Sequence, residues 1–385
     1  MRGRGEQARL PVDHQGQMFY CFDMDSRIPQ GHPLRSIKAQ ADAELARLRP
    51  AFAAAYATTG RPSIPPEQLI KATLLQALYT IRSERRLCEE INYNLLYRWF
   101  LDLSPEAEVW EHSVFSKNRE RFAEHVASEL ARRLMRRFFD SSVAQAIRDD
   151  AASEEHFSVD GTLIEAWASM KSVGPKDSDD DKRGSGDSNR WTNWRGEKRT
   201  NETHESKSDP QARLARKENG QGAILAHSAH ALMENRNGLI MDIVIDEANG
   251  QAERENALEM LKRMRRRHRL LPETLGADKG YDDGEFLEAL ECDQLVTPHV
   301  AIRDGVIRDD RVAGQCRREA RKRQRTKAYQ ISQRKRKRVE EIFAWLKTIG
   351  GLAKTRFVGR WKTQLYAYAA SAAYNFLRRA RLAAA

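Results

Sequence analysis

The chain has 385 residues, of which 40% are hydrophobic, and a formal net charge of +11 at pH 7. This length exceeds that of a usual single domain, so two domains are expected. No apolar run approaches the roughly 20 residues that span a bilayer, and the N-terminus lacks the apolar stretch of a signal peptide. The four cysteines lie far apart, which disfavours a disulfide framework or a zinc site. We therefore expect a cytoplasmic protein with a polyanionic partner.

Residues 34–147 show helical periodicity, which predicts an all-α N-terminal domain over residues 1–150. Apolar side chains recur at spacings of three and four over residues 69–78, and further helices are expected over residues 84–93 and 116–139. Short helices joined by tight turns suit a DNA-binding or oligomerisation module. Three arginines could face a DNA backbone there: Arg82, Arg85 and Arg86. Alternatively, the bundle is structural and its aromatic residues form the core.

A different pattern begins at Phe157, where a short strand is expected to end at Asp160 and a glycine turn. Two β-like runs follow, joined by an Asn-Gly hairpin signal. The next expected elements are a helix, a strand, a short helix, a strand and a final helix, at residues 251–268, 275–278, 285–291, 295–298 and 339–347. This order is that of an α/β ribonuclease H-like domain, which we expect over residues 151–385.

Residues 171–222 contain few apolar residues and many Asp, Ser, Gly, Lys and Arg. This composition predicts a flexible basic insertion within the catalytic domain. Beyond it, His227 and His230 lie three apart in a strand-like run. They should therefore face opposite sides of a sheet, which disfavours one metal ion shared between them.

Asp160 and Asp278 each follow a short apolar run and precede a nearby glycine. Phosphodiester cleavage by two divalent cations, about 4 Å apart, needs oxygen ligands held close together. Two acids on neighbouring strands and a third on a packed helix would supply them. Glu340 is the candidate for the third acid, and Glu341 is the alternative. The spacing alone also allows Asp160 to cap a helix over residues 162–168.

The segment from Arg317 to Arg338 contains twelve Lys or Arg and one acid, so it carries +11 by itself. Clustered charge of one sign indicates a nucleic-acid partner, whereas the alternative is a solvated basic tract. The residues that we expect to contact DNA in this segment are Arg334, Lys335, Arg336, Lys337 and Arg338.

Several segments, in the same order, resemble bacterial insertion-sequence transposases of the DDE class. The segments with the acids are SVDGTLIEAWAS (158–169), GADKGYD (276–282) and SQRKRKRVEEIFAWLK (332–347). Residues 82–87, 97–100 and 112–119 resemble the helical domain of the same family. The resemblance extends over most of the chain, and it implies a transposase whose catalytic and metal-binding acids are Asp160, Asp278 and Glu340.

The family's signature around its glutamate is Tyr, two residues, Arg, three residues, Glu, six residues and Lys. Counting back from Lys347 places the Glu at 340 and the Arg at 336, which favours Glu340 over Glu341. Gln333 stands at the Tyr position, so no role of that Tyr is carried over. The resemblance implies that Arg336 and Lys347 contact the phosphates of transposon ends.

The resemblance further implies Mg²⁺ as the cofactor, with Mn²⁺ as a substitute. The expected partners are double-stranded DNA, as terminal inverted repeats and as target, and a second copy of the chain in the active complex. The expected location is the cytoplasm, at the nucleoid. Two alternatives remain. One is a metal-dependent nuclease of the same fold that cuts without joining. The other is a non-catalytic DNA-binding derivative, against which the presence of all three acids counts.

Overall fold

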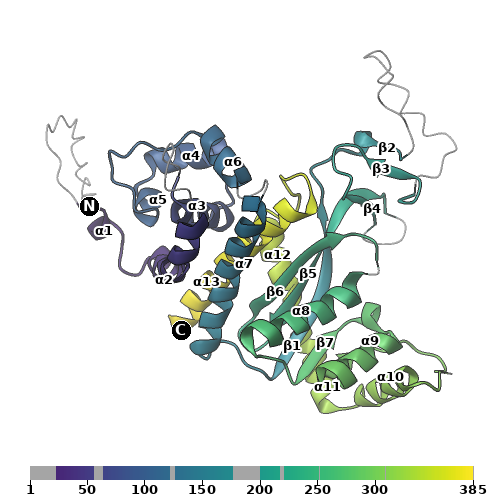
Figure 1. Ribbon diagram of the computed structural model, residues 1–385. Helices are drawn as coiled ribbons and strands as arrows, with labels where there is room; N and C mark the ends of the chain where they lie inside the picture. Colours follow the sequence, from purple (N-terminus) through teal and green to yellow (C-terminus); the bar gives the residue numbers. More distant parts are fainter. Residues whose placement is uncertain are drawn as a thin grey trace, which may run out of the picture.

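The computed structural model describes residues 23–55, 64–121, 126–176, 200–216, 221–250, 252–307 and 309–384. Its N-terminal half is helical (Figure 1), with α1 (Met24–Arg27), α2 (Pro33–Ala55), α3 (Pro66–Leu78), α4 (Glu84–Tyr93), α5 (Leu95–Phe100), α6 (His112–Arg121) and α7 (Val126–Arg148). The helix expected over residues 116–139 corresponds to parts of α6 and α7, and residues 122–125 between them lie outside the described part of the chain. α6 packs against α4, whereas α7 packs against α2 and a C-terminal helix.

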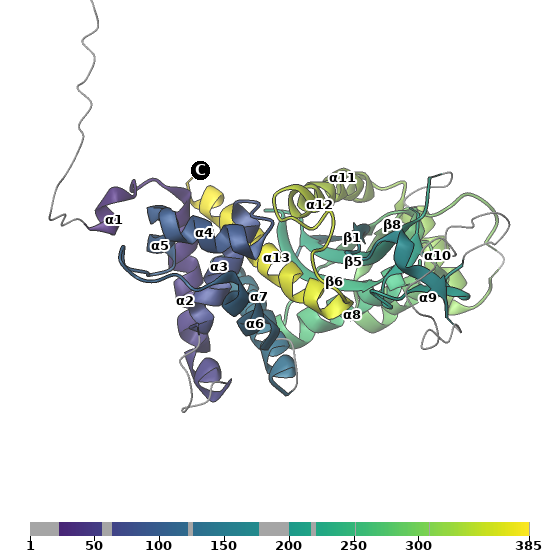
Figure 2. The same ribbon diagram turned by 90° about the horizontal axis from the view of Figure 1, so that it is seen from above.

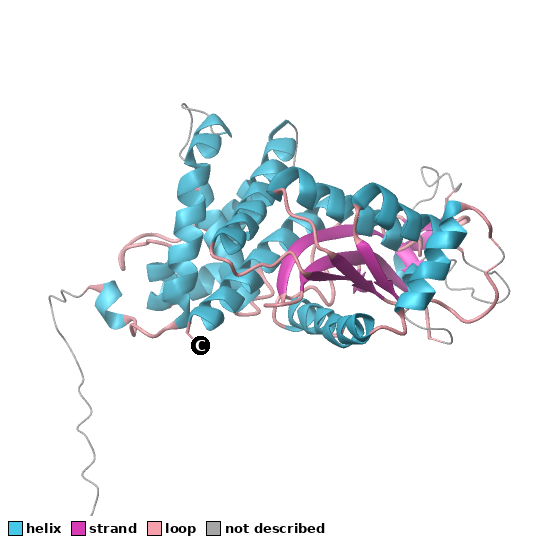
Figure 3. Cartoon of the chain, turned by 90° about the horizontal axis from the view of Figure 1, so that it is seen from below, coloured by secondary structure: helices cyan, strands magenta, loops and turns pink. Residues whose placement is uncertain are grey.

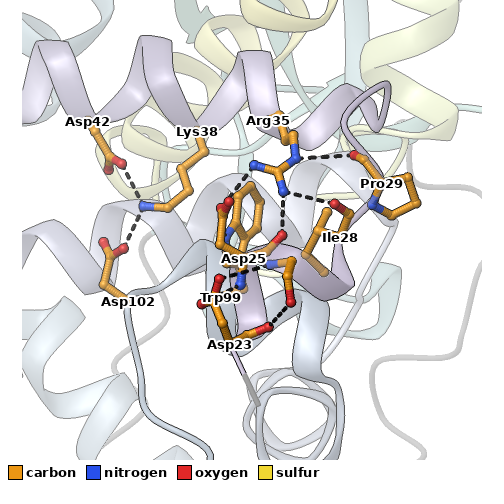
Figure 4. Close-up of polar contacts among 10 residues, drawn as sticks. Asp23, Asp25, Ile28, Pro29, Arg35, Lys38, Asp42, Trp99 and Asp102 are labelled. Carbon is orange, nitrogen blue, oxygen red and sulfur yellow. Dashed lines mark hydrogen bonds and ion pairs between the residues drawn. The ribbon is translucent and has the colours of Figure 1, made fainter.

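Polar contacts tie the first helices of this half to α5 and to Asp102, two residues after the end of α5 (Figure 4). Trp99 is buried, and its indole nitrogen donates to Asp25 Oδ1 at 2.9 Å. Lys38 Nζ lies 2.6 Å from a carboxylate oxygen of Asp42 and 2.6 Å from one of Asp102. These charged groups therefore hold helices together. Trp99 belongs to the core, which agrees with the alternative that the aromatic residues of the bundle are structural.

The second half contains the strands. Its elements are β1 (His156–Glu165), β2 (Val173–Pro175), β3 (His204–Ser206), β4 (Arg213–Ala215), β5 (Ile224–Glu234), β6 (Leu239–Glu247), α8 (Ala252–His268), β7 (Thr274–Ala277), α9 (Gly284–Glu288), β8 (Thr297–Val300), α10 (Val312–Arg323), α11 (Lys327–Arg336), α12 (Arg338–Thr348) and α13 (Arg360–Ala383), with short 3₁₀ or π turns at Met170–Ser172, Lys279–Tyr281 and Ala289–Gln294. In the described ranges, no helix combines the length and the apolar character that crossing a membrane requires.

The main sheet has the strand order β6–β5–β1–β7–β8, and β4 pairs with the start of β5. β1, β5 and β6 are antiparallel neighbours, whereas β7 is parallel to β1 and to β8. The hairpin between β5 and β6 confirms the Asn-Gly signal, because Gly238 has a φ of +73°, which glycine adopts readily. Helix α8 covers one face of the sheet and α11 and α12 cover the other (Figures 2 and 3).

The segment expected to be a flexible insertion, residues 171–222, has regular structure where it is described. β2 pairs with β3, and β4 joins the main sheet. A small apolar cluster supports these strands, formed by Ala166, Ala168, Val173, Ala212 and Leu225. A few small buried side chains and backbone pairing therefore order a segment whose composition is mainly polar. Residues 177–199 and 217–220 lie outside the described part of the chain.

One apolar core runs through both halves of the molecule. Helix α13 packs against α2, α3 and α7 on one side and against β6 on the other. Its Asn375 side chain accepts a hydrogen bond from Ile240 N (2.9 Å) and donates one to Ile240 O (2.8 Å). Arg136 of α7 also reaches Asp242 of β6, at 3.2 Å. Helix α13 is therefore a structural part of both halves.

Candidate active site

Asp160 lies within β1 and Asp278 directly follows β7, and the parallel register of these two strands places the two aspartates at corresponding positions. The pairing of β1 with β7 ends where Ser158 lies opposite Gly276, so each aspartate lies two residues beyond this last pair. Because side chains alternate along a strand, Asp160 points to the same face of the sheet as Ser158. β7 ends at Ala277, whereas β1 continues to Glu165.

The expectation that Asp160 ends a short strand is wrong, and so is the alternative that it caps a helix. Asp160 lies within a ten-residue strand, because residues 161–165 continue the ladder with β5. Gly161 therefore forms no turn. It pairs with His230, and a Cβ atom at Gly161 would lie 3.0 Å from His230 Nδ1. The glycine leaves room for this side chain.

The Asp160 carboxyl is largely buried, and burial is the main reason that its pKa rises to about 6. A hydrogen bond of 2.8 Å from Gly161 N opposes this rise in pKa. The negative charge of Asp278 raises the pKa further, Arg336 lowers it, and Glu340 raises it. The three acids therefore share one electrostatic environment.

Glu340 and Glu341 both lie in the first turn of α12 and are exposed, but their surroundings differ. The charge of Glu340 acts on Asp160, whereas the charge of Glu341 acts on Tyr374 of α13. This difference favours Glu340 over Glu341, and the place of Glu340 in the site stays a prediction.

The side chains of the three acids do not form a closed set of metal ligands in this structure. Within the described ranges, no three His, Cys, Asp or Glu side chains gather closely enough to hold a metal ion. A cationic group lies beside Asp160 instead, because Arg336 Nη1 is 3.5 Å from its Oδ2 atom. The carboxylate oxygens are nevertheless ligands of the kind that hard divalent cations prefer.

Two side chains near the acids, Glu253 and Tyr281, were not found by sequence reasoning. A Cβ atom at Gly280 would lie 3.0 Å from Asp278 Oδ1 and 3.5 Å from Glu253 Oε2. Glu253 lies in the first turn of α8, where acids are common because they favour the helix dipole, so nothing in the sequence distinguishes it. Tyr281 is buried, and its place in the 276–282 motif was the available signal.

The basic tract is helical, and its cations fall into two groups. In α10, Arg317 forms an ion pair with buried Asp282 at 2.7 Å, and Arg318 donates to the Asp309 carbonyl at 2.8 Å. These arginines stabilise the fold. A second group is exposed at the end of α11 and the start of α12: Arg334, Lys335, Lys337 and Arg338. Their contact with DNA stays a prediction.

Two residues in the signature positions have partners within the chain. Gln333 Nε2 donates to the carbonyls of Ala277 (3.3 Å) and His299 (2.5 Å), near the ends of β7 and β8. Gln333 therefore links β7 and β8 to α11. Lys347 Nζ donates to Thr162 Oγ1 at 2.6 Å, two residues after Asp160 in β1. The DNA contact expected of Lys347 stays a prediction.

The three N-terminal arginines are exposed on and just before α4. Arg85 and Arg86 line an open groove with Tyr93, whose side chain is 78% exposed. Arg86 also lies 3.4 Å from Glu90. The groove combines cations with an aromatic ring, which suits a nucleic-acid surface. Contact between Arg82, Arg85 or Arg86 and DNA stays a prediction.

Comparison with known protein families assigns the chain to a class. The Transposase DDE domain family matches residues 153–376, which is more than half of the chain. The chain therefore belongs to this family. The Transposase domain (DUF772) family matches residues 22–121, in the helical half. Together these domains are those of a DNA transposase.

No curated protein shows a significant match. Among solved structures, the Mos1 transposase paired-end complex with left transposon end is similar at 12% sequence identity and a TM-score of 0.20. The alignment covers 77% of this chain and 79% of that chain.

Proposed function

We propose that this transposase binds the terminal inverted repeats of an insertion sequence, cuts the ends of the element and transfers them to target DNA. The catalytic acids in this proposal are Asp160, Asp278 and Glu340. It is carried by the parallel register of β1 and β7, which places the two aspartates at corresponding positions. The influence of Glu340 on the pKa of Asp160 supports the third assignment.

We infer a ribonuclease H-like fold for residues 151–385 and a DNA-binding or oligomerisation role for the helices of residues 1–150. The first inference is supported by a sheet with three antiparallel strands followed by two that run parallel to β1, with helices on both faces. The second is supported by the groove at α4, with its exposed cations and Tyr93.

The proposed cofactor is Mg²⁺, with Mn²⁺ as a substitute. It would be held by Asp160, Asp278 and Glu340, whose oxygens fit a hard divalent cation. Such ions make a water or a 3′-hydroxyl nucleophilic near neutral pH and neutralise charge on the leaving oxygen. Asp160 has to lose its proton for this role, and the nearby Arg336 favours that loss. Gln333 fixes the strand ends that carry the neighbouring acid.

The proposed partner is double-stranded DNA, which the exposed cations at the end of α11 would hold beside the acids. Because two ends must be paired, we propose a homodimer in the active complex, in the cytoplasm at the nucleoid. The spacing of Arg336, Glu340 and Lys347 supports membership of the Tyr-Arg-Glu-Lys branch, from which Gln333 departs.

Cleavage of labelled DNA that carries the element's flanking repeats tests this proposal. Wild type, Glu340→Gln and the matched control Glu341→Gln are compared with Mg²⁺, with Mn²⁺ and with EDTA. We expect metal-dependent cuts at the repeat ends by wild type and by the control, and none by Glu340→Gln. Binding of the repeats without cutting by any variant would favour the non-catalytic derivative.

A second substrate, with a pre-cleaved end and a free 3′-hydroxyl, separates a transposase from a nuclease. Joined products with target DNA support the transposase. Cutting of the first substrate without joining of the second would favour the nuclease.

A further inference from the structure

A fourth carboxylate, that of Glu253, lies between the two segments that carry the aspartates. A Cβ atom at Gly161, the residue after Asp160, would lie 3.3 Å from Glu253 Oε1. A Cβ atom at Gly280, two residues after Asp278, would lie 3.5 Å from Glu253 Oε2. One oxygen therefore faces the β1 segment and the other faces the segment after β7. The two glycines leave the space that this carboxylate occupies.

The Glu253 carboxylate has neither a hydrogen bond nor an ion pair with any residue in the described ranges. It is half-buried, and burial raises its pKa, as do the negative charges of Asp278 and Asp160. Arg254 lowers the pKa, but by less. Like charges held together away from water oppose folding, because each disfavours ionisation of the others. A bound cation would remove this penalty.

Two buried polar atoms, on residues that adjoin these segments, lack a partner in the described part of the molecule: His230 Nδ1 and the Tyr281 hydroxyl. Both side chains are 1% exposed. His230 Nδ1 lies 3.0 Å from the position of a Cβ at Gly161, next to Glu253. Tyr281 directly follows Gly280, the glycine that faces Glu253 Oε2. Buried polar atoms normally have a partner, and the water shell of a bound cation would supply one.

We propose that Glu253 is a fourth carboxylate ligand at the cation site, acting together with Asp160 and Asp278. The inference rests on the proposed function, because it requires a divalent cation at those two aspartates. It differs from an ordinary acid in the first turn of a helix, which interacts only with the helix dipole. Glu255 is such an acid, since it lies in the same turn and is exposed.

Binding of Mn²⁺ to the full chain tests the inference without any DNA. The bound fraction is measured from the loss of the electron paramagnetic resonance signal of free Mn²⁺. The proteins are wild type, Glu253→Gln, Glu255→Gln and Asp160→Asn. We expect Glu253→Gln to weaken Mn²⁺ binding about tenfold or more, as loss of a charged ligand should. We expect Glu255→Gln to bind as wild type does.

Two other outcomes are distinguishable. If Asp160→Asn loses Mn²⁺ binding while Glu253→Gln binds like wild type, the role of Glu253 is overturned and the proposed cation site stands. If Asp160→Asn binds Mn²⁺ like wild type, the cation site of the proposed function fails, and the role of Glu253 fails with it.

The melting temperature provides a second measurement, which distinguishes the loss of a metal ligand from a folding defect of the variant. Without metal, Glu253→Gln should melt above wild type, because it removes a charge that two neighbours repel. Added Mn²⁺ should then raise the melting temperature of wild type by more than that of Glu253→Gln. A metal-free Glu253→Gln protein that melts below wild type and below Glu255→Gln would assign Glu253 a structural role and overturn the inference.

Discussion

The Arg336 guanidinium lies 3.5 Å from Asp160 Oδ2, so a residue expected to hold transposon-end DNA stands beside the first acid of the candidate site. The side chains are 17% and 23% exposed, which leaves this pair partly shielded from water. A cation bound at Asp160 would compete with Arg336 for the carboxylate. We therefore expect metal binding to free Arg336 for a DNA phosphate, with which arginine forms strong charge-assisted hydrogen bonds.

Replacement of Arg336 by Gln should raise the pKa of Asp160, because the positive charge now lowers it. The pH profile of metal-dependent cleavage should therefore shift to higher pH. Arg336→Lys keeps the charge and serves as the control, with a profile close to that of wild type. Equal profiles for the Gln and Lys variants would show that the charge does not act on the reacting acid.

Asp160 should make the metal-free protein less stable as pH rises from about 4 to 6. Its folded pKa, about 6, lies above the ordinary aspartate value of 3.8, so the folded state holds the proton more tightly in this window. Asp160→Asn should therefore be more stable than wild type at pH 7.5 in EDTA, by on the order of 3 kcal/mol. The gain should vanish below pH 4. Denaturant unfolding at both pH values measures it.

Gly161→Ala should reduce both stability and metal-dependent cleavage. The new methyl group would lie 3.0 Å from His230 Nδ1 and 3.3 Å from Glu253 Oε1, closer than the buried His230 ring can easily accommodate. Overpacking of this kind costs about 1–3 kcal/mol. Gly222→Ala is the matched control, since no atom lies within 4 Å of its added Cβ. Unchanged unfolding of Gly161→Ala would contradict the close packing.

Lys335→Ala and Arg317→Ala should separate the two groups of cations. Lys335 is exposed, so its replacement by Ala should weaken DNA binding. It should also reduce the slope of log affinity against log salt by about 1. Loss of Arg317 leaves fully buried Asp282 without its ion pair, which should destabilise the fold by about 3 kcal/mol. Salt titrations of DNA binding and thermal unfolding distinguish the two effects. A Lys335 variant with an unchanged salt slope would argue against DNA contact at the end of α11.

Sequence reasoning located the secondary structure that has a strong local signal. The hairpin at Gly238 and the helix that begins at Ala252 lie where the turn signal and the periodicity predict them. It failed where long-range pairing decides the structure. Gly161 reads locally as a turn, but its pairing with His230 keeps it within a strand. The strands in residues 171–222 likewise depend on partners that a polar composition does not reveal.

The sequence predicts those residues of the candidate site that lie in recognisable motifs. The register that aligns Asp160 with Asp278 is a property of the folded sheet, and the motifs supplied only the two aspartates. Glu253 had no distinguishing signal, because an acid in the first turn of a helix is common for reasons unrelated to catalysis. Its position became visible only through the two glycines that face its carboxylate.

Helix α13 packs against α2, α3 and α7, although more than two hundred residues separate it from them along the chain. During synthesis, the N-terminal helices therefore emerge from the ribosome long before the helix that completes their core. Their final packing has to wait until residues 360–383 have been made. By then the chain already carries Asp160, Asp278 and Glu340. A nascent transposase thus completes its helical half only after all three acids have been synthesised.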